Sequence, residues 1–144
     1  MKKLLVLFYL VPFFGTSQIK HLDPVQSKTV GTAWYCLEKI AWLQEELADG
    51  QTFYQLVYKN YFDSKMCGAN EIKFTGGQAV LDELCKSLQD AIAKPKCGKT
   101  SILLGDQLLS MEVKKGLTRK FLEISADAAV FQLNENQIEK LFGK

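Results

Sequence analysis

The chain has 144 residues, of which 47% are hydrophobic and 24% are charged, with 18 lysines and arginines against 16 aspartates and glutamates. This length predicts one domain that is large enough to bury a core without the support of disulfides or metals, and the near-neutral charge excludes a strongly basic nucleic-acid binder. The formal net charge of +2 belongs to Lys2 and Lys3, so removing an N-terminal leader makes the chain nearly neutral and leaves no net attraction for nucleic acid or an anionic membrane.

The N-terminus, MKKLLVLFYLVPFFGTSQ, places two lysines before an apolar run from Leu4 to Phe14 and then small residues. This pattern is typical of a secretory signal peptide, and the run is shorter than the about 20 residues that a membrane-spanning helix needs. We therefore predict a signal peptide over residues 1–17, no transmembrane anchor after cleavage, and a secreted or periplasmic protein; the short MKK leader favours a bacterial source. Residues 18–30 are predicted to form a flexible arm before a single domain at 31–144.

The segment 32–48, TAWYCLEKIAWLQEELA, permits two interpretations. Cys36, Ile40, Leu43 and Leu47 share a helical face, whereas the aromatic and β-branched residues of the segment favour a strand. A strand would form a hairpin with the next segment, 52–62, which is rich in aromatic residues and is itself predicted to be a strand.

A change of hydrophobic period marks the next elements. A short strand is predicted at 71–75, and a helix at 78–93 follows from the apolar stripe that includes Leu81, Leu88 and Ile92. The remaining segments predicted as strands are 100–104, 108–114, 119–124 and 128–133. Asn134 and Gln137 have capping-box spacing before a short C-terminal helix at 135–142.

This order of elements predicts an α+β fold. We expect a single antiparallel sheet of short strands, with the one long helix 78–93 packed on it and the short helix 135–142 at the end. The sequence shows no internal repeat that would divide this domain.

The stretch AKPKCGKT, 93–100, comes close to the G-x-x-x-x-G-K-[ST] spacing of a P-loop, with Ala93 in place of the first glycine. A functional P-loop follows a strand and opens a helix, whereas here a helix is predicted to end in the motif, so that a phosphate would meet the negative end of its dipole. We therefore predict that no nucleotide or other cofactor binds here, and that Lys94, Lys96 and Lys99 lie in a solvated loop.

Four cysteines stand at positions 36, 67, 85 and 97 without a C-x-x-C pair, and His21 is the single histidine. This pattern argues against a metal site, whereas export favours disulfides. Cys67 and Cys97 are the candidate disulfide, because both precede glycine at the same end of the predicted strand and helix unit at 71–93. Cys85 is expected to face the core, and Cys36 either pairs with it or stays a buried thiol.

Catalytic chemistry has little support in the sequence. The sequence argues against a catalytic triad, because the single histidine lies in the predicted arm. Carboxylates that could serve as an acid–base pair and lysines that could serve as a base are present, but their spacing does not predict that they meet in one cleft. The carboxylates are Asp82, Glu83, Asp106 and Glu112, and the lysines are Lys73 and Lys99. A small enzyme using carboxylate or lysine chemistry is the alternative hypothesis, and a redox-active thiol at Cys36 or Cys85 is a third.

Aromatic residues gather between positions 34 and 62. Because both faces of the strand predicted at 52–62 are partly apolar, one face has to enter the core and the other is available for contact with a partner. The candidate partner-binding residues are Phe53, Tyr54, Tyr58 and Tyr61, and ordinary core packing is the alternative. The basic stretch KKGLTRK, 114–120, is predicted to be a solvated hairpin tip, with contact to an anionic partner as the alternative. The leading hypothesis is an exported, non-catalytic protein that binds a protein or a glycan.

Overall fold

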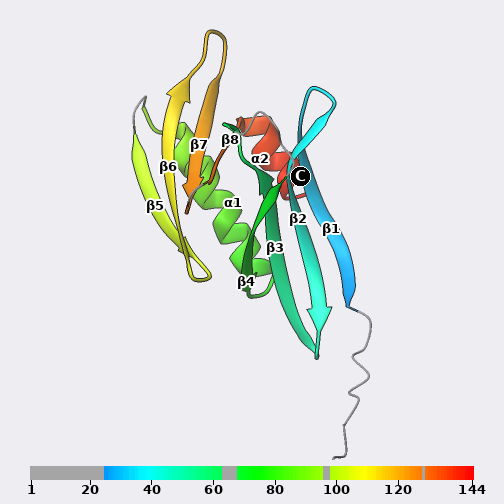
Figure 1. The fold of residues 1–144 in the computed structure, drawn as a ribbon. Helices are drawn as coiled ribbons and strands as arrows, with labels where there is room; N and C mark the ends of the chain where they lie inside the picture. The colour runs from blue at the N-terminus through cyan, green and yellow to red at the C-terminus, as the bar shows by residue number, and fades with distance from the viewer. Residues whose placement is uncertain (1–24, 63–67, 96–97, 128) are drawn as a thin grey trace, which may run out of the picture.

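The computed structural model describes residues 25–62, 68–95, 98–127 and 129–144, which form two four-stranded antiparallel sheets and two helices (Figure 1). The first sheet contains β1 (Gln26–Tyr35), β2 (Glu38–Ala48), β3 (Gln51–Lys59) and β4 (Ala69–Thr75), in this order. The second sheet contains β5 (Lys99–Leu104), β6 (Gln107–Lys115), β7 (Lys120–Ala126) and β8 (Ala129–Leu133), in this order. Helix α1 (Gln78–Ala93) follows β4, and helix α2 (Glu135–Leu141) follows β8.

The prediction of a single sheet with one long helix packed on it is wrong. The strands divide into two separate four-stranded meanders, and both helices, not one, pack against the sheets. The strand segments themselves lie close to where they were expected, because period-2 alternation is a local property. How the strands group into sheets depends on contacts between distant residues, which the alternation does not specify.

The ambiguous segment 32–48 is a β-hairpin and not a helix. Its apparent helical stripe has a local cause: Cys36 lies in the turn, and the pairing shifts beside Ile40, where Ala33 pairs with Ala41 but Trp34 pairs with Lys39. A bulge of this kind changes the strand period and imitates a helical spacing. Strand β1 begins at Gln26, so residues 26–30, which were expected in the arm, are part of the sheet.

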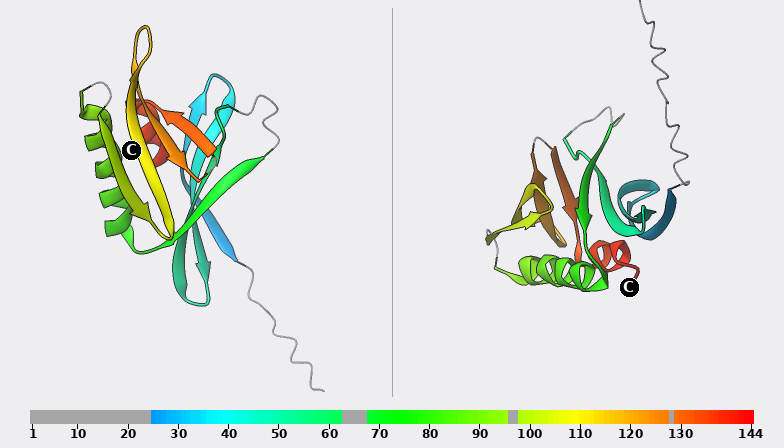
Figure 2. Two further views of the ribbon diagram at one scale, coloured as in Figure 1. Left: turned by 60° about the vertical axis from the view of Figure 1, so that its left-hand side comes forward. Right: turned by 90° about the horizontal axis from the view of Figure 1, so that it is seen from below.

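The order of elements repeats, although the sequence showed no repeat: four antiparallel strands and a helix occur twice. Each helix packs against the sheet of the other unit. Helix α1 lies against β6 and β7, and α2 lies against β1 and contacts α1 (Figure 2). Because each unit supplies the helix that covers the other unit's sheet, the two units share one core.

Both helices begin where their sequences predicted, although the sheets on which they pack were not predicted. The stripe on α1 is buried, with Leu81 and Leu88 each 2% exposed and Ile92 6% exposed. Asn134 caps α2: its side chain accepts a hydrogen bond from the Gln137 amide at 2.9 Å, and the Gln137 side chain accepts one from the Asn134 amide at 2.8 Å. Within the described part of the chain, neither helix combines the length and the apolar character needed to cross a membrane.

Candidate functional site: a groove between two hairpins

A groove of about 680 Å³ lies between the β1–β2 hairpin and the β6–β7 hairpin. Both hairpin tips project at the same end of the molecule (Figures 1 and 2), which we call the hairpin end. The described residues that line the groove are Trp34, Tyr35, Cys36, Glu38, Ile40, Lys59, Tyr61, Gly116, Leu117, Thr118, Arg119, Lys120, Phe121, Phe131, Gln132, Asn134 and Gln137.

The β1–β2 hairpin forms the aromatic wall of the groove. Tyr35 pairs with Glu38 across a two-residue turn, and Trp34 and Tyr35 are 51% and 66% exposed. Cys36 in the turn has φ 54°, a left-handed backbone conformation that residues other than Gly, Asn and Asp seldom adopt. Glu38 forms an ion pair with Lys59 at 2.7 Å, which joins the tip of this hairpin to the end of β3.

The β6–β7 hairpin forms the basic wall. The Gly116 amide donates a hydrogen bond to the Arg119 carbonyl at 2.8 Å, which closes the turn and leaves the Leu117 side chain fully exposed. Arg119 and Lys120 are exposed beside it, and no described carboxylate lies within ion-pairing distance of either. The stretch KKGLTRK is therefore a hairpin tip, as predicted.

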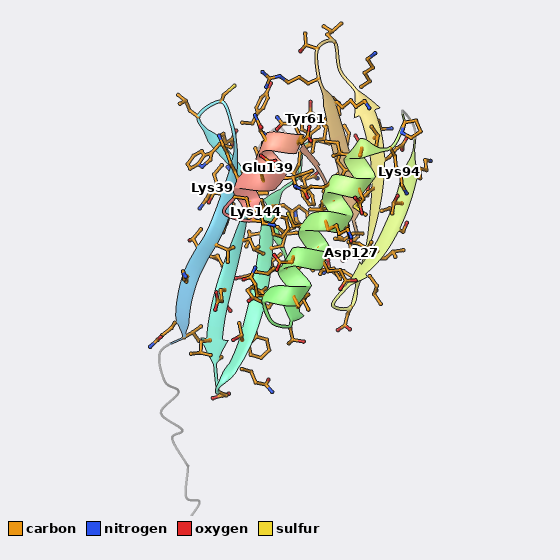
Figure 3. The ribbon with its side chains drawn as sticks, turned by 180° about the vertical axis from the view of Figure 1, so that it is seen from behind. Lys39, Tyr61, Lys94, Asp127, Glu139 and Lys144 are labelled. Carbon is orange, nitrogen blue, oxygen red and sulfur yellow. The ribbon has the colours of Figure 1, made fainter. Side chains whose placement is uncertain are left out.

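The floor of the groove joins the two sheets. The Tyr61 amide donates to the Val130 carbonyl at 2.6 Å, and the Val130 amide donates to the Asn60 side chain at 3.2 Å. These bonds fix the end of β3 against β8 and bring Tyr61, which is 56% exposed, into the groove. Figure 3 shows Tyr61 and Lys94 in the half of the molecule that carries the hairpin tips, with Asp127 farther from those tips.

Gln137 connects α2 to the aromatic wall. Its Nε2 donates a hydrogen bond to the Trp34 carbonyl at 2.7 Å, while its Oε1 completes the capping box with Asn134. The side chain is only 8% exposed, and both of its polar atoms have protein hydrogen-bond partners in place of water. This one residue therefore sets the position of β1 relative to the start of α2.

We expect Gln137→Ala to lower the free energy of unfolding by about 1–3 kcal/mol, because the Trp34 carbonyl and the backbone amide of Asn134 lose their partner. Urea denaturation followed by tryptophan fluorescence measures this loss. The exposed neighbour Asn136 provides the control, since Asn136→Ala removes no described hydrogen bond. Equal midpoints for the two variants would contradict the role assigned to Gln137.

Tyr58 supports the floor from inside the core. Its ring stacks on Phe131 with 4.4 Å between the centroids, and its side chain is 2% exposed. Burial raises the pKa of the Tyr58 hydroxyl, and the negative charge of Asp127 adds to the rise. Burial likewise raises the pKa of Tyr54, with a smaller contribution from Glu45.

A raised tyrosine pKa makes stability depend on alkaline pH. The contribution of Tyr58 is fully present below its unfolded-state pKa of about 10 and is lost as the pH rises through the higher folded-state value. We expect Tyr58→Phe to flatten the fall in the free energy of unfolding between about pH 9 and pH 11, measured by chemical denaturation at each pH. Tyr35→Phe, at an exposed position, should keep the slope of the parent protein; a Tyr58→Phe variant with that same slope would show that Tyr58 does not titrate as argued.

The structure separates the four aromatic residues predicted to bind a partner. Tyr54 and Tyr58 are buried in the core and have no surface to offer a partner, because positions 54, 56 and 58 of β3 all enter the shared core. Phe53 is half-buried on the opposite face of β3 and does not line the groove. Tyr61 alone of the four lies in the groove. Trp34 and Tyr35, which complete the aromatic wall, were recognised in the sequence as strand-favouring residues and not as site residues.

The groups considered for catalysis are not gathered in the groove. Glu38 is the one carboxylate among the described lining residues, and it is paired with Lys59. Glu112 forms ion pairs with Lys99 and Lys114 at 3.9 and 3.1 Å. Glu123, opposite it on β7, pairs with the same Lys114 at 3.8 Å, and neither glutamate lines the groove. Among the described residues, no three His, Cys, Asp or Glu side chains are grouped to hold a metal ion.

The cysteines are free where the structure describes them. Cys85 is buried, as expected, whereas Cys36 is exposed at the hairpin tip instead of being buried, and the two do not form a disulfide. The candidate pair Cys67 and Cys97 lies outside the described residues, as does His21. The bond between Cys67 and Cys97 therefore stays a prediction.

The stretch resembling a P-loop has the inverted order that the sequence predicted. Helix α1 ends at Ala93, the first residue of the stretch, and β5 begins at Lys99. The Lys94 ammonium donates a hydrogen bond to the Thr100 hydroxyl, so two residues of the motif satisfy one another.

A comparison of the chain with protein-family models, with curated proteins and with solved structures found no match.

Proposed function

We propose that this chain is an exported, non-catalytic binding protein that holds a protein or glycan partner in the groove at its hairpin end, outside the cytosol. The signal-peptide pattern of residues 1–17 supports export. The groove supplies both an aromatic wall and amide side chains, which suit the apolar and polar parts of such a partner.

The observation that carries this proposal is the exposure of large apolar side chains around the groove. Trp34, Tyr35, Leu37, Tyr61, Phe62 and Leu117 are all more than half exposed and lie at this end of the molecule. Single exposed apolar residues are normal on a protein surface, but a cluster that rims a groove marks a contact surface.

The polar groups of the groove fit recognition better than turnover. Gln132, Asn134 and Gln137 offer amides, and Arg119 and Lys120 offer cations. A hydrolytic site needs a nucleophile with a base or two facing carboxylates, and the described lining residues supply one ion-paired carboxylate and no histidine. The arrangement therefore favours orientation of a partner over acid–base chemistry.

Affinity capture with the cleaved protein, followed by titration of the purified partner or of a glycan panel, tests the proposal. We expect Trp34→Ala and Tyr61→Ala each to weaken binding at least tenfold, since buried aromatic anchors typically contribute more than about 1 kcal/mol to an interface. Leu103→Ala, which truncates an exposed side chain on β5 outside the groove, is the matched control. A partner that binds all three variants equally well would refute this binding face.

An activity screen of the same protein distinguishes the enzyme hypothesis. Turnover abolished by Glu38→Gln with the fold intact would replace the binding proposal with a catalytic one. Folding is checked by circular dichroism, because Glu38 also holds Lys59.

A further inference from the structure

Charge is unevenly distributed along the molecule although the chain is nearly neutral. Glu38 and Glu135 lie at the hairpin end, and Lys28, Lys73 and Lys144 lie at the opposite end, but the excess at each end has the opposite sign. The exposed cations of the hairpin end come from the β6–β7 turn and from the junction of α1 and β5: Lys94, Lys99, Lys115, Arg119 and Lys120. The acidic residues of the opposite end come from β2, the β2–β3, β5–β6 and β7–β8 turns and the first half of α1: Glu45, Glu46, Asp49, Asp82, Glu83, Asp106 and Asp127.

This segregation follows from the topology. In an antiparallel meander, alternate turns lie at opposite ends of the sheet, so residues far apart in sequence gather at one end. Arg119 and Lys120 also line a second hollow with Ile92 and Ala93, which places the end of α1 beside the basic hairpin; Glu135 is the one carboxylate among the described residues that line it. The net charge of the sequence conceals this local positive field.

The basic end also carries the most exposed apolar side chains of the hairpins. Leu37 is 96% exposed at the tip of the β1–β2 hairpin, and Leu117 is 105% exposed at the tip of the β6–β7 hairpin. Tyr35 and Trp34 stand behind Leu37, and cations flank Leu117 on both sides in the sequence KKGLTRK. The exposed leucines therefore belong to the turns of two hairpins, and these turns project at the same end of the fold (Figure 1).

We infer that the hairpin end docks on an anionic membrane surface. In this arrangement Leu37 and Leu117 enter the boundary between headgroups and acyl chains, the aromatic residues lie at headgroup level, and Lys115, Arg119 and Lys120 contact lipid phosphates. The acidic end points away from the surface, so the charge distribution also sets the orientation. The inference rests on the export proposed above and on the same end of the molecule, with the groove opening toward the membrane.

Projecting leucines favour a membrane over an acidic protein as the partner. A protein interface needs a surface that fits the two tips and the hollow between them, whereas a bilayer accepts separate apolar projections and requires no complementary shape. A cation attracts lipid phosphates most strongly when no carboxylate of the protein is close to it. No described carboxylate is within ion-pairing distance of Lys115, Arg119 or Lys120.

Co-sedimentation of the cleaved protein with vesicles of phosphatidylglycerol and phosphatidylcholine, and with vesicles of phosphatidylcholine alone, tests the inference. We expect binding to the anionic vesicles that weakens as salt is added. Replacing Lys115, Arg119 and Lys120 together by glutamine should weaken binding about 100-fold, since each such charge near the surface is worth about fivefold. Leu37→Ser and Leu117→Ser should each cost about tenfold.

The chain offers matched controls at the acidic end. Leu103→Ser with Leu108→Ser removes two exposed leucines, 72% and 57% exposed, from the β5–β6 hairpin, and Lys28→Gln with Lys73→Gln removes two cations from the same half. Neither pair should change vesicle binding by more than twofold. Circular dichroism confirms that each variant is folded.

The possible results separate this inference from the proposed function. No binding to anionic vesicles, or equal losses in the tip and control variants, overturns the inference. Capture of a partner by a protein that ignores vesicles leaves the proposed function standing alone, and vesicle binding without any groove partner supports the inference alone. Binding of the basic end to an acidic protein or to the acidic end of a second copy, with no vesicle binding, overturns the membrane inference in favour of a protein partner.

Discussion

The Gly31→Ala variant is expected to lose about 3 kcal/mol or more of unfolding free energy, at the upper end of what overpacking costs. A Cβ at Gly31 would lie 2.2 Å from the Lys140 carbonyl oxygen and 2.4 Å from that of Leu141. Both obstacles are backbone atoms in the last turn of α2, so no side chain can rotate away and the helix has to leave β1. Urea denaturation measures the loss.

Gly68→Ala is the matched control for this variant. A Cβ at Gly68 meets no atom within 4 Å, and we expect a change within about 0.5 kcal/mol. If Gly31→Ala is as stable as Gly68→Ala, α2 does not lie on β1 at the described distance.

Truncating Leu141 is expected to have an effect of similar size. Leu141 is 0% exposed in the last turn of α2, and removing its side chain leaves a cavity whose cost is about 3–4 kcal/mol. Because α2 covers the sheet of the other unit, Leu141→Ala should also speed the hydrogen exchange of β1 amides. Denaturation and exchange measured by NMR together check the prediction.

The control for Leu141 is Leu103→Ala, which removes a side chain that is 72% exposed and should change stability by less than about 0.5 kcal/mol. The location of the exchange effect is the decisive readout. Faster exchange confined to β7 and β8, with β1 unchanged, would show that α2 stabilises its own unit and that the helices are not exchanged.

The sequence by itself determined those features that depend on near neighbours. The stripe from Leu81 to Ile92 specified α1, because a helix brings residues three and four apart onto one face. Asn134 and Gln137 specified the start of α2 through a capping box that spans three residues. The basic stretch around Gly116 was likewise recognisable as a hairpin tip, since a turn is decided by its own few residues.

Only the tertiary structure decided how these elements cover one another. Periodicity shows which face of a strand or helix is apolar but not which distant element packs on it, so one sheet was predicted where two exist and the exchange of helices was not foreseen. For the same reason Tyr58 and Tyr61, three positions apart, were grouped together although one is buried and the other lies in the groove. The bond from Gln137 to Trp34 joins residues 103 positions apart. The hairpin end likewise exists only because the folded meanders bring its aromatic and basic turns together, since free energy gained between distant residues leaves no local pattern in the chain.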